Sequence, residues 1–406
     1  MGTCNSSNAE ADLFYRGVKS RNLDQVYRIL RMNPTLNVNM QNRDDHGNTP
    51  LICAVRNNDF DMVRFLVEEA NAKVNAKNNH KATPLLHACE SGHVKIVSYL
   101  TDHEKNQSVN IKNMLGRTPL STAASRGHVE IIQILMKQAN IKIDIKDRFG
   151  WTPLRNSAAN GNLVAVRYLI ERANATVDVR DHQGMTPLLW AAGNSHLGVV
   201  RYLIHEAKAN FASKDKFGSN VLLTAARGFY SFRLKVIKFL INKNVDVNSM
   251  DNSGKTTLML LARYGQFEET RYLVEQAKAC VNATDHKGWT ALMYATAQIG
   301  QSCIMSCHCQ GLIDTVRYLV EKEETIVTPM HIKKLEECIS LSGFQSSQQH
   351  PFPPSRCYNS DGRTQAVLHL KYLQTRKITS VALQRDLNEI YMLHPSIILA
   401  IFKSTS

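Results

Sequence analysis

The residues of this chain that most resemble a metal site lie between positions 303 and 309. Cys303, Cys307, His308 and Cys309 place four thiol or imidazole ligands within seven residues, and such side chains bind Zn²⁺ or another thiophilic metal. The spacing is poor, because the adjacent His308 and Cys309 rarely reach one tetrahedral site together with both other thiols. Modification of a thiol, as in a palmitoylated or redox-sensitive loop, and a plain insertion remain as alternatives. We therefore expect no cofactor and treat these four residues as weak metal candidates.

A second fragment imitates a phosphate-binding loop. Ser253-Gly254-Lys255-Thr256 matches the end of the Gly-x-x-x-x-Gly-Lys-Thr pattern, whose backbone N–H groups bind phosphates. That pattern requires a glycine five residues before Gly254, and Ser249 stands there. The sequence also contains neither a Gly-x-Ser-x-Gly elbow nor the set of kinase motifs. We interpret the fragment as a turn followed by a helix cap, and we expect no catalytic residue.

The N-terminal residues indicate a third kind of chemistry, the attachment of fatty acids. Met1-Gly2-Thr3-Cys4-Asn5-Ser6 matches the acceptor pattern for N-myristoylation at Gly2. One myristoyl chain binds a membrane only marginally, so that stable anchoring needs a second signal. Residues 1–20 carry no basic cluster, which leaves palmitoylation of Cys4 as the natural second signal. We expect dual acylation at Gly2 and Cys4 in a eukaryotic cell, with a disordered polar tail as the alternative.

Composition narrows the class of protein. No apolar run approaches 18 residues, the length that marks a candidate transmembrane helix. The N-terminus also lacks the charged region followed by an apolar core that marks a secretory signal. The nine cysteines are odd in number and scattered, which favours a reducing compartment over a disulfide framework. The net charge of +14 favours an acidic partner, whether phospholipid, acidic protein or nucleic acid.

A repeated unit organises most of the chain. A Thr-Pro-Leu tripeptide recurs five times, three looser copies follow, and successive copies are 34 to 36 residues apart. Asp-x-x-Gly, which precedes most copies, predicts a tight turn, while Thr and Pro suit the cap and the first position of a helix. A second helix with an apolar stripe, such as Leu163, Val166, Leu169 and Ile170, completes each unit. The copies begin at Thr49, Thr83, Thr118, Thr152, Thr186, Asn220, Thr256 and Thr290.

These units resemble the ankyrin repeat family, whose signature is Thr-Pro-Leu-His-x-Ala after such a turn. The resemblance covers roughly residues 40–325 and implies an all-α solenoid of stacked helix pairs with turn tips. The signature histidine is replaced in every copy, which puts the hydrogen bond that it makes between repeats in doubt. The replacements are Ile52, Leu86, Ser121, Arg155, Leu189, Leu223, Met259 and Met293.

The domain boundaries follow from where this pattern begins and ends. We expect a flexible tail over residues 1–8 and a repeat domain over 9–325, with an N-terminal capping unit, about eight repeats and an insertion over 298–310. Beyond it we expect three further segments: a helix over 326–341, a Ser/Gln/Pro-rich linker over 342–363 and a helical cap or small module over 364–406.

The resemblance also implies where a partner binds. Members of the family use the turn tips and the exposed positions of the first helix, and all three tryptophans of this chain fall at such positions. Tryptophan and arginine are enriched at the energetic centres of interfaces. We expect a partner with apolar and acidic contact residues. The predicted contact residues are Arg148, Phe149, Trp151, Asn156, His182, Met185, Trp190, Lys216, Phe217, His286, Lys287 and Trp289.

The sequence therefore favours a non-catalytic interaction scaffold or adaptor. With acylation it would be tethered to the cytoplasmic face of a membrane; without acylation it would be a soluble cytosolic or nuclear adaptor or effector. A regulatory subunit of an enzyme, or an enzyme with its activity in the C-terminal segment, is a weaker alternative, because that segment contains no recognisable nucleophile–base pair. Nucleic-acid binding is disfavoured, since basic-aromatic RNA motifs and a paired zinc site are missing.

Overall fold

The structure is a computed structural model that describes residues 3–103, 109–228, 232–301 and 308–321. Over these residues it contains eighteen α-helices, one short 3-10 helix and two isolated β-bridges, so the predicted all-α fold is confirmed. Backbone contacts divide the chain into two units. Unit 1 comprises residues 1–216 and 228–236, and unit 2 comprises residues 217–227 and 237–406.

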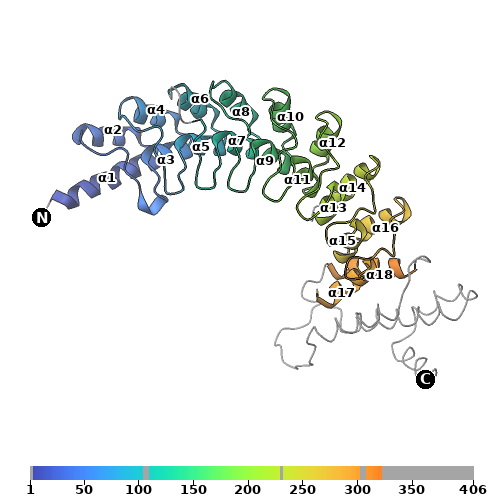
Figure 1. Cartoon of the computed structure of the whole chain (residues 1–406). Helices are drawn as coiled ribbons and strands as arrows, with labels where there is room; N and C mark the ends of the chain where they lie inside the picture. Colours follow the sequence, from blue (N-terminus) through green and yellow to red (C-terminus); the bar gives the residue numbers. More distant parts are fainter. Residues whose placement is uncertain (1–2, 104–108, 229–231, 302–307, 322–406) are drawn as a thin grey trace, which may run out of the picture. The chain divides into compact units, whose positions relative to one another are not determined.

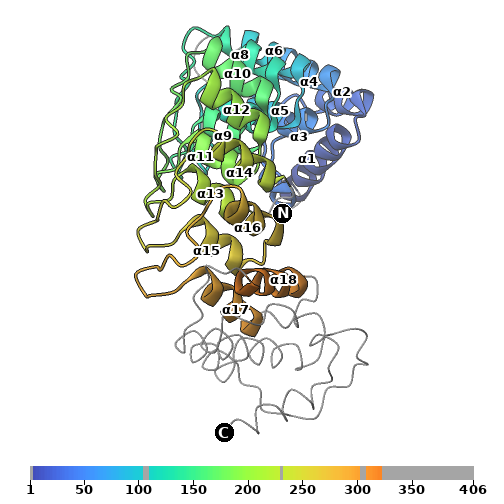
Figure 2. The same cartoon turned by 90° about the vertical axis from the view of Figure 1, so that its right-hand side faces the viewer.

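Unit 1 is a stack of helix pairs. Figure 1 shows its inner helices α3, α5, α7, α9 and α11 in one row and its outer helices in a second row. The hairpins between successive pairs, which we term fingers, project from the inner row on the side away from the outer helices, as Figure 2 also shows. The helices are α1 (Thr3–Lys19), α2 (Leu23–Met32), α3 (Pro50–Arg56), α4 (Phe60–Glu68), α5 (Pro84–Ser91), α6 (Val94–His103), α7 (Pro119–Arg126), α8 (Val129–Met136), α9 (Pro153–Ala159), α10 (Leu163–Glu171), α11 (Pro187–Gly193) and α12 (Leu197–His205).

Unit 2 continues the same pattern of inner and outer helices. Its inner helices α13, α15 and α17 contact one another in order, and its outer helices α16 and α18 also pack together. The helix α14 (Arg233–Ile241) crosses the division between the units. The other helices are α13 (Val221–Arg227), α15 (Thr257–Arg263), α16 (Phe267–Glu275), α17 (Ala291–Gln301) and α18 (His308–Glu321).

Each inner helix begins where the sequence places its cap. The Thr152 hydroxyl accepts a hydrogen bond from the N–H of Arg155 at 3.2 Å, and Pro153 occupies the first helical position. Equivalent threonines cap α3, α5, α7 and α11, again with proline following. Asn220 caps α13 in the degenerate copy by accepting from the N–H groups of Leu222 and Leu223. These side chains satisfy N–H groups that have no partner within the helix.

An aspartate or asparagine side chain shapes most of the fingers. Asp147 Oδ1 accepts hydrogen bonds from the N–H groups of Phe149 and Trp151, both at 2.9 Å, and its own N–H donates to the carbonyl of Trp151. Asn78, Asn113, Asp181, Asp251 and Asp285 make the same pair of side-chain contacts in their fingers. The first finger differs, because Asn42 takes this role and the 3-10 helix Arg43–Asp45 widens the turn.

Glycine in the finger allows the next finger to approach closely. Gly150 has a φ of +79°, and a Cβ placed there would lie 2.9 Å from the backbone nitrogen of His182. That nitrogen donates a hydrogen bond to the carbonyl of Phe149 at 3.1 Å. A side chain at this position would therefore be strained and would also separate the two fingers.

The core of unit 1 lies between the inner and outer rows. Leu51, Leu85 and Leu120 of the inner helices and Ile131 and Leu135 of α8 are all at least 99% buried. In α10 the predicted stripe is buried at Val166 and Leu169 and half-buried at Leu163 and Ile170. Because each pair presents apolar side chains to the next pair, no single unit could bury its own surface.

The N-terminal helix pair packs on the first repeat. Tyr15 of α1 is buried, and its hydroxyl donates to Asp45 Oδ2 at 2.7 Å, while Arg56 pairs with Asp45 Oδ1 at 3.0 Å. Burial, together with the Asp45 carboxylate, raises the pKa of Tyr15.

Contrary to the expected flexible tail over residues 1–8, α1 begins at Thr3. Residues 3–8 are mostly poor helix formers, but they lie directly before this packed segment, so the helix can propagate into them.

The insertion over 298–310 also differs from the expected loop. The inner helix α17 runs on to Gln301, and α18 begins at His308, so part of the insertion lengthens helices. No proline lies between Thr296 and Gln301, so the helix is not interrupted there. Three expected segments lie outside the described residues: the helix over 326–341, the linker over 342–363 and the cap over 364–406.

Gly311 brings α18 against the turn before α16. A Cβ at Gly311 would overlap the carbonyl oxygen of Gly265, whereas a Cβ at Gly198 in α12 would meet only Leu163 Cδ2, at 3.6 Å. We expect Gly311→Ala to lower the free energy of unfolding of unit 2 by about 1–3 kcal/mol, because backbone cannot yield as a side chain can. Gly198→Ala is the matched control and should be neutral or stabilise by up to about 1 kcal/mol. Urea denaturation followed by circular dichroism measures both; equal stabilities would contradict the prediction.

Candidate functional site

The predicted contact residues fall into two groups, one in each unit. Seven side chains are exposed and lie on fingers, as expected for contact positions: Arg148, Phe149, His182, Lys216, Phe217, His286 and Lys287. The three tryptophans, Trp151, Trp190 and Trp289, are half-buried. Unit 1 contains the residues from Arg148 to Lys216, and unit 2 contains Phe217, His286, Lys287 and Trp289.

A stack of alternating cationic and aromatic side chains organises the site in unit 1. The Arg155 guanidinium lies 3.7 Å from the ring centroid of Trp151 and 3.9 Å from that of Trp190. Arg117 also lies over the Trp151 ring, with its guanidinium carbon 5.9 Å from the ring centroid. The residues come from three successive repeats, so the stack fixes neighbouring fingers and inner helices to one another.

Arg155 carries a positive charge inside this stack. Burial lowers its pKa to about 10, while the carboxylates of Asp181 and Asp147 oppose that shift. The residue therefore remains protonated at neutral pH. Asp181 also accepts a 2.7 Å hydrogen bond from the indole nitrogen of Trp190, which ties the second ring to the same carboxylate. Two carboxylates and two ring faces thus compensate for the loss of water around the guanidinium.

An exposed apolar patch adjoins the stack. The Phe149 ring, 46% exposed, lies 4.8 Å from the ring of Trp151. Met114 and Leu115 on the preceding finger are each 40% exposed. The N–H of Arg148 donates to the carbonyl of Leu115 at 3.0 Å, so the two fingers that carry the patch are joined by backbone. Large apolar side chains that are held in place yet remain exposed are typical of contact sites.

Two of the predicted contact residues are wrong. Asn156 is 4% exposed, and its Oδ1 accepts a hydrogen bond from Arg155 Nη1 at 3.2 Å. Met185 is 8% exposed, and its backbone pairs with Asp181 at the base of its finger. Both side chains are therefore buried in the solenoid, which their positions in the repeat did not reveal.

Arg155 was missed as a site residue, although the sequence carries a signal for it. It occupies the position of the signature histidine, and the residues at this position in all eight repeats are at least 94% buried. Arg155 is the only charged residue among the eight. A buried charge requires partners nearby, and Trp151 and Trp190 lie four residues before it and 35 residues after it.

The residues predicted in unit 2 surround a hydrogen-bonded aromatic pair. The ring centroids of Trp289 and Tyr294 are 5.2 Å apart, and the Tyr294 hydroxyl donates to Asp285 Oδ2 at 2.6 Å. Burial would raise the pKa of Asp285, but the hydrogen bonds from Tyr294 and from the N–H groups of Trp289 and Lys287 outweigh it and lower the pKa. His286 and Lys287 are exposed on the finger that this carboxylate shapes.

The weak metal candidates receive no support. Cys303 and Cys307 lie outside the described residues, as do the side chains of His308 and Cys309. Within the part of the chain that the structure describes, no three His, Cys, Asp or Glu side chains are grouped so that they could hold a metal ion. Cys53 and Cys89 are buried free thiols, as expected of core residues.

The acylation candidates also stay predictions. Gly2 lies outside the described residues, and of Cys4 only the backbone is placed, in α1. Among the helices in the described ranges, none has the length and apolar character needed to cross a membrane.

The stack predicts a specific effect on stability and fluorescence. We expect Arg155→Ala to lower the free energy of unfolding by about 2–3 kcal/mol, because it removes a buried cation from between two rings and leaves nearby carboxylates less compensated. Tryptophan emission should shift to longer wavelength, since Trp151 and Trp190 are two of the three tryptophans. Arg148→Ala, on the exposed finger tip, is the control and should change stability by no more than about 0.5 kcal/mol. Unchanged emission in Arg155→Ala would contradict the stacked arrangement.

Comparison with protein families agrees with this architecture. A family profile described as ankyrin repeats (3 copies) matches residues 70–147, 105–181, 141–215 and 222–329, and one described as ankyrin repeat matches residues 46–79. No curated protein matches the chain. The matches cover more than half of the sequence and coincide with the stacked helix pairs and fingers described above, and the chain therefore belongs to the ankyrin repeat family.

Proposed function

We propose that this chain is a non-catalytic interaction scaffold that binds a partner protein on the fingers of unit 1. Ankyrin repeats are generally protein-interaction modules, and the proteins that contain them are typically non-enzymatic. The observation that carries the proposal is the exposed Phe149 ring beside Trp151, which Arg155 in turn holds against Trp190.

The arrangement suits binding because its aromatic rings are already ordered. Side chains that are fixed before association lose less conformational entropy when a partner covers them. Met114, Leu115 and Phe149 add apolar surface that is exposed in the free protein. Arg117 and Arg148 lie on the same two fingers and can pair with carboxylates at the edge of the contact.

Substitution of Phe149 tests the proposal without disturbing the stack. Phe149→Ala should reduce capture of the partner from a cell extract at least about tenfold, because truncation of a central aromatic side chain commonly costs 2 kcal/mol or more. Val164→Ala is the matched control, since Val164 is 66% exposed on the outer helix α10. Quantitative mass spectrometry of the captured proteins measures both effects. Equal recovery with the two variants would place the binding surface elsewhere.

We further propose that acylation of Gly2 and Cys4 tethers the scaffold to the cytoplasmic face of a membrane. The support is the sequence pattern Met1-Gly2-x-x-x-Ser6 with Cys4 inside it, which supplies the two signals that stable anchoring requires. A soluble cytosolic or nuclear adaptor is the alternative if the pattern is not used.

Expression in a eukaryotic cell tests the tether. The intact mass should rise by one myristoyl group at Gly2, and Gly2→Ala should abolish both this gain and membrane fractionation. Cys4→Ser should keep the myristoyl group but weaken fractionation with membranes, because one chain binds only marginally. Ser7→Ala, outside the acceptor positions, is the control. Wild-type protein without a mass gain would eliminate the proposal.

A further inference from the structure

Charge is distributed unevenly between the second to sixth fingers and the outer helices α4 to α12 of unit 1. The finger segments 73–82, 109–117, 142–151, 176–185 and 210–216 carry eleven lysines and arginines but five aspartates, whereas α4, α6, α8, α10 and α12 carry four basic and five acidic residues. The basic finger residues are Lys73, Lys77, Lys81, Lys112, Arg117, Lys142, Lys146, Arg148, Arg180, Lys214 and Lys216.

Four of the five finger aspartates accept hydrogen bonds within the protein. Asp147 and Asp181 are buried and accept from backbone N–H groups of their own fingers. Asp144 accepts from the N–H and hydroxyl of Thr176, and Asp178 accepts from the N–H of Asn210. These carboxylates keep their negative charge, but eleven basic residues outnumber the five aspartates, so the net charge of these fingers is positive.

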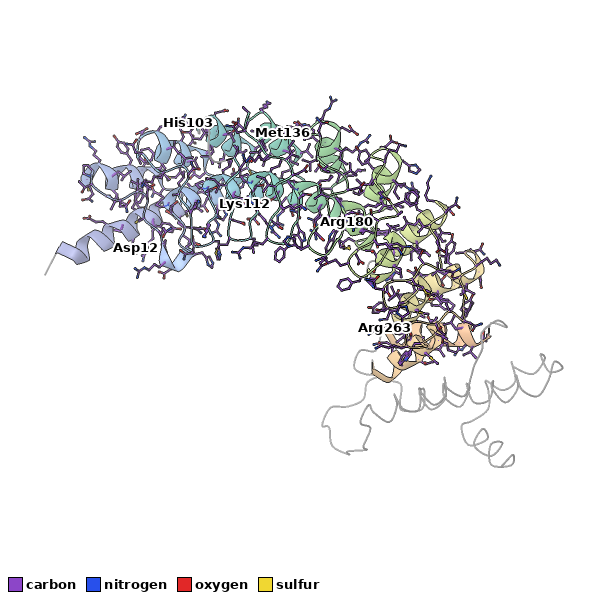
Figure 3. The ribbon with its side chains drawn as sticks, viewed as in Figure 1. Asp12, His103, Lys112, Met136, Arg180 and Arg263 are labelled. Atoms are coloured by element: carbon purple, nitrogen blue, oxygen red, sulfur yellow. The ribbon has the colours of Figure 1, made fainter. Side chains whose placement is uncertain are left out.

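Several finger cations follow one another along the row of repeats. Lys112 Nζ donates to the carbonyl of Lys146 at 3.1 Å, and Lys146 Nζ donates to the carbonyl of Arg180 at 2.9 Å. An ammonium group has three N–H donors, so one carbonyl contact leaves capacity for an anionic ligand. Figure 3 labels Lys112 and Arg180 on the finger side of unit 1, away from His103 and Met136 on the outer-helix side.

Basic residues lie beside the exposed apolar side chains and on the fingers to either side of them. Met114, Leu115 and Phe149 lie on the fingers 109–117 and 142–151, which also carry five of the eleven basic residues. The finger 73–82 on one side carries three lysines, and the finger 210–216 on the other side carries two. Protein interfaces commonly combine an apolar centre with a polar or charged rim. The complementary ligand has apolar residues in its middle and negative charge on both flanks.

We infer that the fingers of unit 1 bind an extended acidic segment of the partner protein, with its carboxylates against the flanking lysines and an apolar residue against Phe149. This inference rests on the proposed function and specifies the partner's chemistry. A polypeptide can place apolar residues between two acidic stretches of one chain. Nucleic acid and an anionic bilayer also present negative charge to these fingers, and both are tested below as competing ligands.

Selection of peptides on the full chain tests the inference. A displayed library of random peptides of about 20 residues, long enough to cross several fingers when extended, is enriched on the wild-type protein and sequenced. We expect enriched peptides to carry Asp and Glu on both sides of an aromatic or aliphatic residue. Fluorescence anisotropy then gives the Kd of the best peptide, which should rise with salt concentration because exposed charges are screened.

Charge reversal provides the matched comparison. Lys77→Glu/Lys214→Glu changes both flanks and should weaken the best peptide about tenfold, since opposed charges become like charges. Lys137→Glu/Arg172→Glu makes the same charge change at exposed ends of α8 and α10 and should leave the Kd within about twofold.

The outcomes separate this inference from the proposed function. Enrichment of apolar peptides without acidic flanks, abolished by Phe149→Ala, would keep the binding site and overturn its acidic specificity. No enrichment on the wild-type protein would overturn both. Tighter binding of a single-stranded oligonucleotide or of phosphatidylserine vesicles than of any selected peptide at about 150 mM salt would assign the basic fingers to those ligands instead.

Discussion

Most fingers depend on one side chain at their start. The carboxylate or amide accepts two backbone N–H groups and closes the turn, and the residue two positions before the cap, usually glycine, adopts a positive φ. In the finger of Asp147, the resulting turn places the carbonyl of Phe149 where the N–H of His182 can reach it. The alignment of neighbouring fingers therefore depends on a short side chain that accepts hydrogen bonds from backbone N–H groups of its own turn.

The proposed binding site depends on one of the same aspartates. Asp181 shapes its own finger and also receives the indole N–H of Trp190, so a structural carboxylate orients one wall of the cationic–aromatic stack. Arg155 fills the space between the two rings at a position where other repeats have an apolar or small residue. A single arginine, at a position that other repeats use for core packing, thus supports the Trp151 ring beside the exposed Phe149.

Much of this architecture could be predicted from sequence because its determinants are local. Thr152 and Pro153 start a helix, and Gly150 ends a turn, whatever the neighbouring repeats contain. Asn156 and Met185 were assigned wrongly because position within the repeat does not reveal that their side chains are buried. The stacking of Arg155 requires side chains from two other positions in space, which spacing within one repeat does not encode.

The backbone contact between adjacent fingers has a mechanical consequence. At the tips, one N–H···O bond joins each finger of unit 1 to the next, as between Lys216 and Gln183. Cooperativity in such an array passes from neighbour to neighbour, so the fingers can shift in small steps instead of as one rigid body. A ligand that crossed several fingers at once would couple repeats that the chain itself connects only in series. Its affinity would then depend on the stiffness of the array as well as on the contacts at each finger.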